Sequence, residues 1–165
     1  MKHIFIVDEN VAIFAATLEG PDGSRDLTCA RLLNLMVANC HGFAWSTAIN
    51  ARWSNAAQRL QASRRMLAPS FPAVMSQAHT VAGKCPCPEN GDPPRLDEEV
   101  TWSTKLIDDR DFIRLAAYFG ACFLVTYDVP LRVDIQTLGL DVRYRFQVIT
   151  PDEALPLASE PSDDS

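Results

Sequence analysis

Carboxylates follow two apolar stretches of this chain that lie far apart in the sequence. Asp8 ends the segment HIFIVD, and Asp128 ends the segment CFLVTYD. Both stretches have the apolar character of strands buried in a parallel sheet, and such strands end at one common edge. A cluster of Asp108, Asp109 and Asp111 stands at the start of an amphipathic helix in IDDRDFIRLAAYFG. Carboxylates gathered at one sheet edge would suit a hard divalent cation, Mg²⁺ or Mn²⁺.

Strand and helix patterns alternate along the chain, which predicts an α/β protein. We expect a three-layer α/β/α domain with a central, mostly parallel sheet of four to five strands. Strands are expected at residues 3–8, 42–46, 122–128 and 142–150. Helices are expected at 10–17, 26–40 (capped by Asp26), 47–67 (capped by Ser46 or Thr47) and 112–120, with a loop or short helix at 129–139 and a helical turn at 151–155.

The length of 165 residues suits one domain, which can bury roughly 70% of its unfolded surface. We expect that domain to span residues 1–155, with a proline-rich insertion at about 67–99 that is partly helical near 71–79, and an acidic flexible tail at 156–165. The apolar stretches are too short for a membrane span or a signal peptide, and the odd number of cysteines, 5, suggests reduced thiols in the cytoplasm. A net charge of −6 argues weakly against unspecific adhesion to nucleic acid or membrane.

Two other chemistries are less well supported by the sequence. Cys85 and Cys87 form a lone Cys-Pro-Cys, which lacks the further ligands at defined spacing that a zinc site needs. A receiver-like signalling domain also pairs acids after its first strand, but it needs a lysine after its last strand. The lysines here are Lys2, Lys84 and Lys105.

Four segments together resemble the PIN-domain ribonucleases over residues 3–155, with the closest likeness to the branch of bacterial toxins. The segments are VDEN, DDRDFIRLAAYFG, GACFLVTYD and VITPDEAL. The resemblance implies an endoribonuclease that uses Mg²⁺ or Mn²⁺ to activate water against single-stranded RNA. It also implies two candidate protein partners, an antitoxin and a second copy of the chain.

Carried over by position, the resemblance implies particular roles for particular residues. The implied metal ligands and catalytic acids are Asp8, Asp109 and Asp128, with Asp108 and Asp111 as neighbours that could share the duty of Asp109. The implied orienting residues are Asn10 and Thr126, and the arginines expected to grip the RNA backbone are Arg52, Arg110 and Arg132.

Two departures from the family pattern leave a second function open. Glu9 stands where the family has Thr or Ser, and the acid expected at the start of the second crossover helix falls on Ala51 or Arg52. Glu9 could replace that acid if the chain bends after Asp8, and Glu98 or Glu99 could reach in from the insertion. Without a replacement, the chain would be a catalytically weakened PIN-like module that binds protein or RNA partners.

Overall fold

The computed structural model describes the backbone of residues 3–82 and 85–161, and the side chains of residues 3–76 and 85–161. At its centre lies a four-stranded, all-parallel sheet in the order β2-β1-β3-β4, which confirms the expected α/β fold. The strands are β1 (Ile4–Val7), β2 (Gly42–Phe43), β3 (Phe123–Val125) and β4 (Gln147–Ile149). The helices are α1 (Glu9–Thr17), α2 (Thr28–Ala38), α3 (Thr47–Ala62), α4 (Phe71–Ala82), the 3-10 helix η1 (Asp97–Thr101), α5 (Thr104–Asp108), α6 (Arg110–Phe119), α7 (Val129–Thr137), α8 (Leu140–Tyr144) and α9 (Pro151–Ser159).

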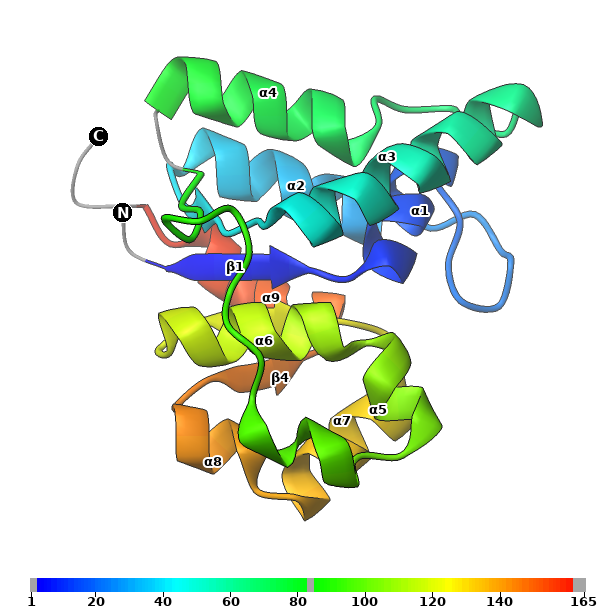
Figure 1. Cartoon of the computed structure of the whole chain (residues 1–165). Coiled ribbons are helices and arrows are strands. Elements are labelled where there is room, and N and C mark those ends of the chain that lie inside the picture. The colour runs from blue at the N-terminus through cyan, green and yellow to red at the C-terminus, as the bar shows by residue number, and fades with distance from the viewer. Residues whose placement is uncertain (1–2, 83–84, 162–165) are drawn as a thin grey trace.

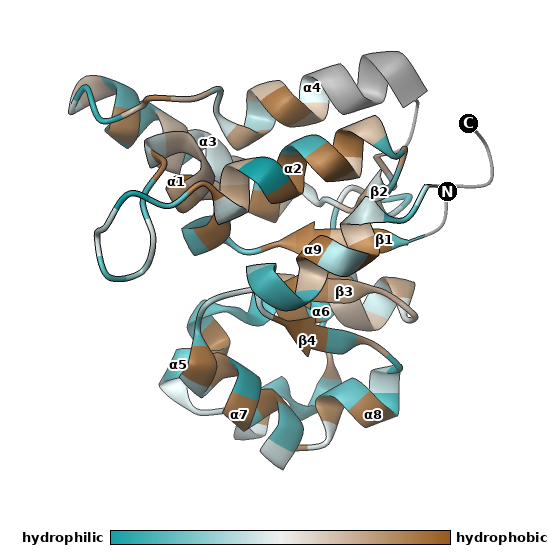
Figure 2. Cartoon of the chain, turned by 180° about the vertical axis from the view of Figure 1, so that it is seen from behind, coloured by the Kyte–Doolittle hydropathy of each residue, from teal (hydrophilic) through white to brown (hydrophobic). Residues whose placement is uncertain are grey.

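Helices cover both faces of the sheet. Helix α6 lies in front of the strands in Figure 1 and packs beside α3, and α9 lies in front of them in the reverse view of Figure 2, packed against α2. The strands are apolar because both of their faces are covered, as the brown colour of β1 and β4 shows (Figure 2). All strands end at one edge, and α1 and α7 begin there directly after β1 and β3.

The α6 segment follows directly from its sequence. Its apolar residues Phe112, Ile113, Leu115 and Ala116 recur at helical spacing and are buried against the sheet. Gly120 ends the helix with φ 54°, and a Cβ there would lie 3.3 Å from the carbonyl oxygen of Tyr144. Glycine therefore suits this tight turn into β3 on both counts.

Two sequence predictions were wrong, and three confirmed strands were predicted too long. Residues 142–144 belong to α8, and the strand expected over 142–150 is only β4, because Arg145 leaves the helix with φ 59° before extended backbone begins. Leu27 is the cap residue of α2, although the Asp26 carboxylate still accepts a hydrogen bond from the Thr28 amide at 2.8 Å. The strands expected over 3–8, 42–46 and 122–128 are confirmed but shorter.

The insertion and the C-terminus contain more helix than the sequence suggested. Helix α4 confirms the expected helical part near 71–79 and extends to Ala82, and η1 follows the loop. Helix α9 runs to Ser159, so residues 156–159 are part of the domain and not of a flexible tail. The rest of the expected tail lies largely outside the described residues. No helix in the described ranges is long and apolar enough to cross a membrane, and all five cysteines are free thiols.

Candidate metal site

The two acids that follow strands also cap the next helices. The Asp8 Oδ1 atom accepts a hydrogen bond from the Glu9 amide at 2.5 Å, and the Asp128 Oδ1 atom accepts one from the Leu131 amide at 2.8 Å. The Asp8 amide donates to the Val125 carbonyl at 3.0 Å, which ties the end of β1 to the end of β3. The parallel pairing of β1 with β3 therefore brings both acids to one edge, as expected.

Asn10 and Thr126 hold the Asp8 carboxylate in place. The Thr126 hydroxyl donates to Asp8 Oδ2 at 2.5 Å, and the Asn10 amide donates to the same oxygen at 2.8 Å. The Thr126 hydroxyl also accepts the Asp128 amide at 2.9 Å, so one side chain links both acids. The expected orienting hydrogen bonds are therefore present.

Helix α3 is anchored to the strand that carries Asp8. The Trp53 indole N–H donates to the Val7 carbonyl at 3.0 Å, and Trp53 is 1% exposed. This contact fixes the neighbouring Arg52 beside the acids. Arg52 therefore lies at the place where the resemblance predicts an acid, although an arginine cannot be a metal ligand.

Asp109 is close enough to Asp8 to oppose the ionisation of the Asp8 carboxyl group. Burial raises the pKa of Asp8 to about 6, the Thr126 hydrogen bond opposes that rise, and the charge of Asp109 adds to it. Burial also raises the pKa of Asp109, the Arg52 guanidinium lowers it, and the charges of Asp128 and Asp108 raise it. The three predicted ligands therefore form one electrostatic group.

The Arg52 guanidinium lies within this group. Its Nη2 atom is 3.4 Å from Asp109 Oδ1, its Nε atom is 3.2 Å from Glu9 Oε2, and its Nη1 atom donates to the Asp108 carbonyl at 2.9 Å. Its Cζ atom is 4.7 Å from the centre of the Phe112 ring, a cation–π contact. A guanidinium carries five N–H groups, so these three hydrogen bonds leave two donors for another partner.

Two cationic side chains that the sequence analysis did not assign to the site lie beside its acids. Arg59 Nη2 is 2.7 Å from Glu9 Oε1, and Lys105 Nζ is 3.3 Å from Asp128 Oδ1. Arg59 stands two helical turns after Arg52 on α3, a spacing that could have signalled a shared face. Lys105 lies on the short helix α5, and no spacing in the sequence connects it with Asp128.

Other expected site residues face different partners. Asp111 pairs with Arg114, and Arg132 pairs with Glu153 through two contacts of 2.9 and 3.2 Å. Asp108 contributes its carbonyl to Arg52, and its side chain is exposed, as is that of Arg110.

The hypothesis that the insertion supplies an acid was wrong. Glu99 is bound by Arg114, and Glu98 is bound by Tyr144 and Arg143. Glu9 begins α1 beside Asp8, but its two oxygens contact Arg52 and Arg59. None of the three candidate replacements, Glu9, Glu98 and Glu99, therefore takes the place of the missing ligand without first losing an arginine partner.

The donor set suits Mg²⁺ or Mn²⁺, although it is not closed around a metal position. Among residues whose side chains are described, no three His, Cys, Asp or Glu side chains converge closely enough to hold an ion as they stand. Mg²⁺ commonly takes only one or two carboxylates and keeps several waters. Asp8 and Asp109, whose charges interact, are the two carboxylates that could meet this smaller requirement, with Asp128 as the third acid of the group.

The two cysteines of the insertion do not converge on one position. The Cys85 thiol contacts the Met75 carbonyl, and the Cys87 thiol contacts the Gly91 carbonyl, each at 3.7 Å. The side chain of His79, a type that could have joined them, lies outside the described residues.

Comparisons with protein-family models, with curated proteins and with solved structures give no match for this chain. The resemblance to PIN-domain ribonucleases therefore stays a prediction, and the functional argument depends on the geometry of the site.

Proposed function

We propose that this protein is a metal-dependent endoribonuclease that cleaves single-stranded RNA, with Asp8, Asp109 and Asp128 holding one Mg²⁺ or Mn²⁺. The observation that carries the proposal is the buried Asp8 carboxylate. It is 5% exposed, it lies beside a second carboxylate, and its pKa is raised to about 6. A cation bound between these groups would remove both the repulsion and part of the cost of burial.

The balance of charge at the site favours one metal ion over two. Four carboxylates lie around three cationic side chains, and the exposed Asp108 carboxylate is near enough to raise the pKa of Asp109, which leaves an excess of two negative charges. The acids are Asp8, Glu9, Asp108, Asp109 and Asp128, and the cations are Arg52, Arg59 and Lys105. A single divalent cation would neutralise this excess.

The chain's own residues would position the reaction. A bound divalent cation supplies Lewis-acid activation of water and stabilisation of phosphate charge. Asn10 and Thr126 keep Asp8 oriented, and the two uncommitted N–H donors of Arg52 can bind an oxygen of the RNA phosphate. Arg52 would then replace a second metal ion as the additional positive charge at the scissile phosphate.

The resemblance extends the proposal to cellular partners. The protein would be the toxin of a toxin–antitoxin pair and would bind an antitoxin protein. A small gene beside that of this protein, encoding a DNA-binding protein, would support this part of the proposal.

The ion pairs of the site favour a second candidate, a PIN-like module that binds partners without catalysis. Arg52, Arg59 and Lys105 already neutralise part of the acid cluster. In that case the arginines would bind RNA or an acidic protein surface, and the acids would serve to hold the arginines in place.

Calorimetric titration with Mn²⁺ separates the two candidates. We expect the wild type to bind one ion, and the Asp8→Asn variant to lose most of that affinity together with RNA cleavage. Asp111→Asn is the matched control, because Asp111 pairs with Arg114 outside the site, and it should bind Mn²⁺ as the wild type does. A wild type that binds no Mn²⁺ would exclude the nuclease and favour the binding module.

A further inference from the structure

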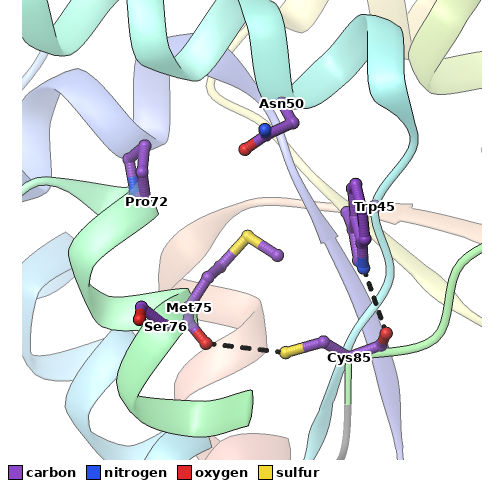
Figure 3. A pocket seen from close by; sticks show the side chains of 6 residues that line it. All are labelled: Trp45, Asn50, Pro72, Met75, Ser76 and Cys85. Carbon is purple, nitrogen blue, oxygen red and sulfur yellow. Dashed lines mark hydrogen bonds between the residues drawn. The ribbon is translucent and has the colours of Figure 1, made fainter. Parts of the chain in front are cut away.

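A small pocket lies after the end of β2, at the same edge of the sheet as the proposed metal site. It has a volume of about 240 Å³ and lies between the start of α3, helix α4 and the loop after α4 (Figure 3). It is lined by Trp45, Asn50, Pro72, Met75, Ser76 and Cys85. No charged side chain is among these residues, so the lining does not repel a polyanion.

Trp45 offers a fixed aromatic surface to this pocket. Its indole N–H donates to the Cys85 carbonyl at 3.0 Å, and its backbone amide donates to the Pro86 carbonyl at 3.0 Å. The ring is seen edge-on in Figure 3, with one face turned toward the space between Asn50 and Met75. Trp53 and Trp102 are 1% and 6% exposed, so the partly buried Trp45 is the tryptophan placed to stack on a ligand.

Asn50 supplies the polar group of the pocket. Its side chain is partly buried, and its amide makes no hydrogen bond to the described part of the chain. An amide presents both a donor and an acceptor, the combination that reads the edge of a nucleobase. Pro72 and Met75 add apolar surface opposite the indole (Figure 3). Aromatic stacking combined with hydrogen bonds to the base edge is how proteins recognise unpaired bases of RNA.

The volume limits what the pocket can hold. Sites for drug-sized ligands and cofactors are about 300 to 1,000 Å³, which is more than this pocket provides. A single flat ring system is the occupant that matches both the volume and the indole face.

The position of the pocket connects it with the acids. Strands β1 and β2 are neighbours, with Phe5 paired to Phe43, so Asp8 and Trp45 follow adjacent strands at the same sheet edge. Asn50 and Arg52 stand two residues apart on α3, so their side chains leave the helix on roughly opposite sides, with the pocket on one side and the acids on the other. An RNA strand that crosses the start of α3 from Arg52 would reach the mouth of the pocket.

We propose that this pocket receives one unpaired nucleobase of the RNA strand, across the start of α3 from the scissile phosphate. The proposal depends on the proposed function for its ligand, but the pocket would bind the base whether or not a metal is present.

The test measures RNA binding without cleavage. A short fluorescently labelled single-stranded RNA is titrated with the protein in a buffer that contains a chelator of divalent cations. We expect Asn50→Ala to weaken binding by about 3-fold, the loss of one hydrogen-bonded contact. Trp45→Ala should weaken it by about 5-fold or more, the loss of one stacked base, and Trp45→Phe should retain most of the affinity. Asn50→Ala is expected to fold, because alanine favours a helix and no hydrogen bond is lost.

RNA that lacks one base provides the decisive control. Oligonucleotides with a single abasic nucleotide, moved along the sequence, should include one position at which the wild type binds as weakly as Trp45→Ala. The variants should show no further loss on that RNA. Equal affinity of wild type, Asn50→Ala and Trp45→Ala for intact RNA would overturn the proposal, as would a wild type that does not bind the RNA. Because no metal takes part, failure of the Mn²⁺ titration would leave this result unaffected.

Discussion

Two arginine–carboxylate clusters lie beside α6, and they differ in how tightly the central arginine binds its acids. The Arg114 cluster consists of Arg114, Glu99, Asp111 and Arg95, and the Arg52 cluster consists of Arg52, Arg59, Glu9 and Asp109. Arg114 binds Glu99 with both Nε and Nη2, and the Leu96 amide donates to the same carboxylate at 2.9 Å. Arg52 makes one contact with each of two acids, at 3.2 and 3.4 Å.

The difference separates a structural contact from a site that can accept a ligand. Glu99 is 5% exposed, and its pair with Arg114 holds the end of the insertion against α6. In the Arg52 cluster, two guanidinium N–H donors make no hydrogen bond to the described residues. The carboxylates of Asp8 and Asp108 lie near it without an ion pair to the part of the chain that the structure describes. The bidentate ion pair of Arg114 holds two elements together, whereas the open Arg52 cluster retains the ability to bind an ion or a phosphate.

The largest expected effect is on folding stability, from breaking the Arg114 cluster. Arg114→Met should destabilise the protein by about 3 to 5 kcal/mol, because it leaves the Glu99 carboxylate buried without its partner. The free energy of unfolding is measured by denaturant titration. The double variant Arg114→Met, Glu99→Leu should recover most of the loss. A destabilisation by Arg114→Met of less than about 1 kcal/mol would contradict the proposal that Arg114 and Glu99 form a buried, tightly bound pair.

The next effect is a pH dependence of opposite sign in the two regions. Burial raises the pKa of Asp8 from 3.8 to about 6, so the folded state binds more protons than the unfolded state between these values. Stability should therefore fall as the pH rises through this window, by about 3 kcal/mol in metal-free protein.

For Glu99, burial favours a higher pKa, but the hydrogen bonds and charge of Arg114 outweigh it and hold the pKa below the usual 4.5. That stabilisation is present above pH 4.5 and is lost as the pH falls through the lowered value. The free energy of unfolding, measured by denaturant titration at a series of pH values, should change less with pH above pH 4 for Asp8→Asn than for the wild type. Identical slopes would contradict the burial of an ionisable Asp8.

The smallest effect concerns the arginine of the open cluster. Arg52→Gln should raise the affinity for Mn²⁺ by about threefold to tenfold, roughly 1 kcal/mol, because a cation beside Asp109 is removed. The same change should weaken RNA binding and reduce its salt dependence by about one phosphate contact. Both affinities are measured by titration.

Arg59→Gln is the matched control for that prediction. Arg59 is 68% exposed and pairs with Glu9 but not with Asp109, so its effect on Mn²⁺ should be smaller. If both variants leave the affinities for Mn²⁺ and RNA unchanged, Arg52 is a structural residue like Arg114.

Much of the framework could be predicted because it depends on local patterns. Apolar segments that end on Asp8 and Asp128 predicted parallel strands with acids at one edge of the sheet. The parallel pairing of β1 with β3 brings the carboxyl ends of both strands, and therefore both acids, to that edge. The amphipathic α6 and the Gly120 turn are equally local. The error at 142–150 arose because VRYRF alternates like a strand, whereas Gly139 and Arg145 take left-handed conformations on either side of α8. Alternation does not reveal such backbone angles.

The sequence by itself therefore determined the α/β fold, the sheet edge that carries the acids and the identity of those acids. Only the tertiary structure decided how their charges are matched. Arg52, Arg59 and Lys105 reach the acids from helices α3 and α5, and Trp45 remains available to a ligand while Trp53 is buried. The physical reason is distance. Hydrophobic periodicity records which face of an element is buried, but electrostatic pairing depends on atoms a few ångströms apart that belong to elements far apart in the chain.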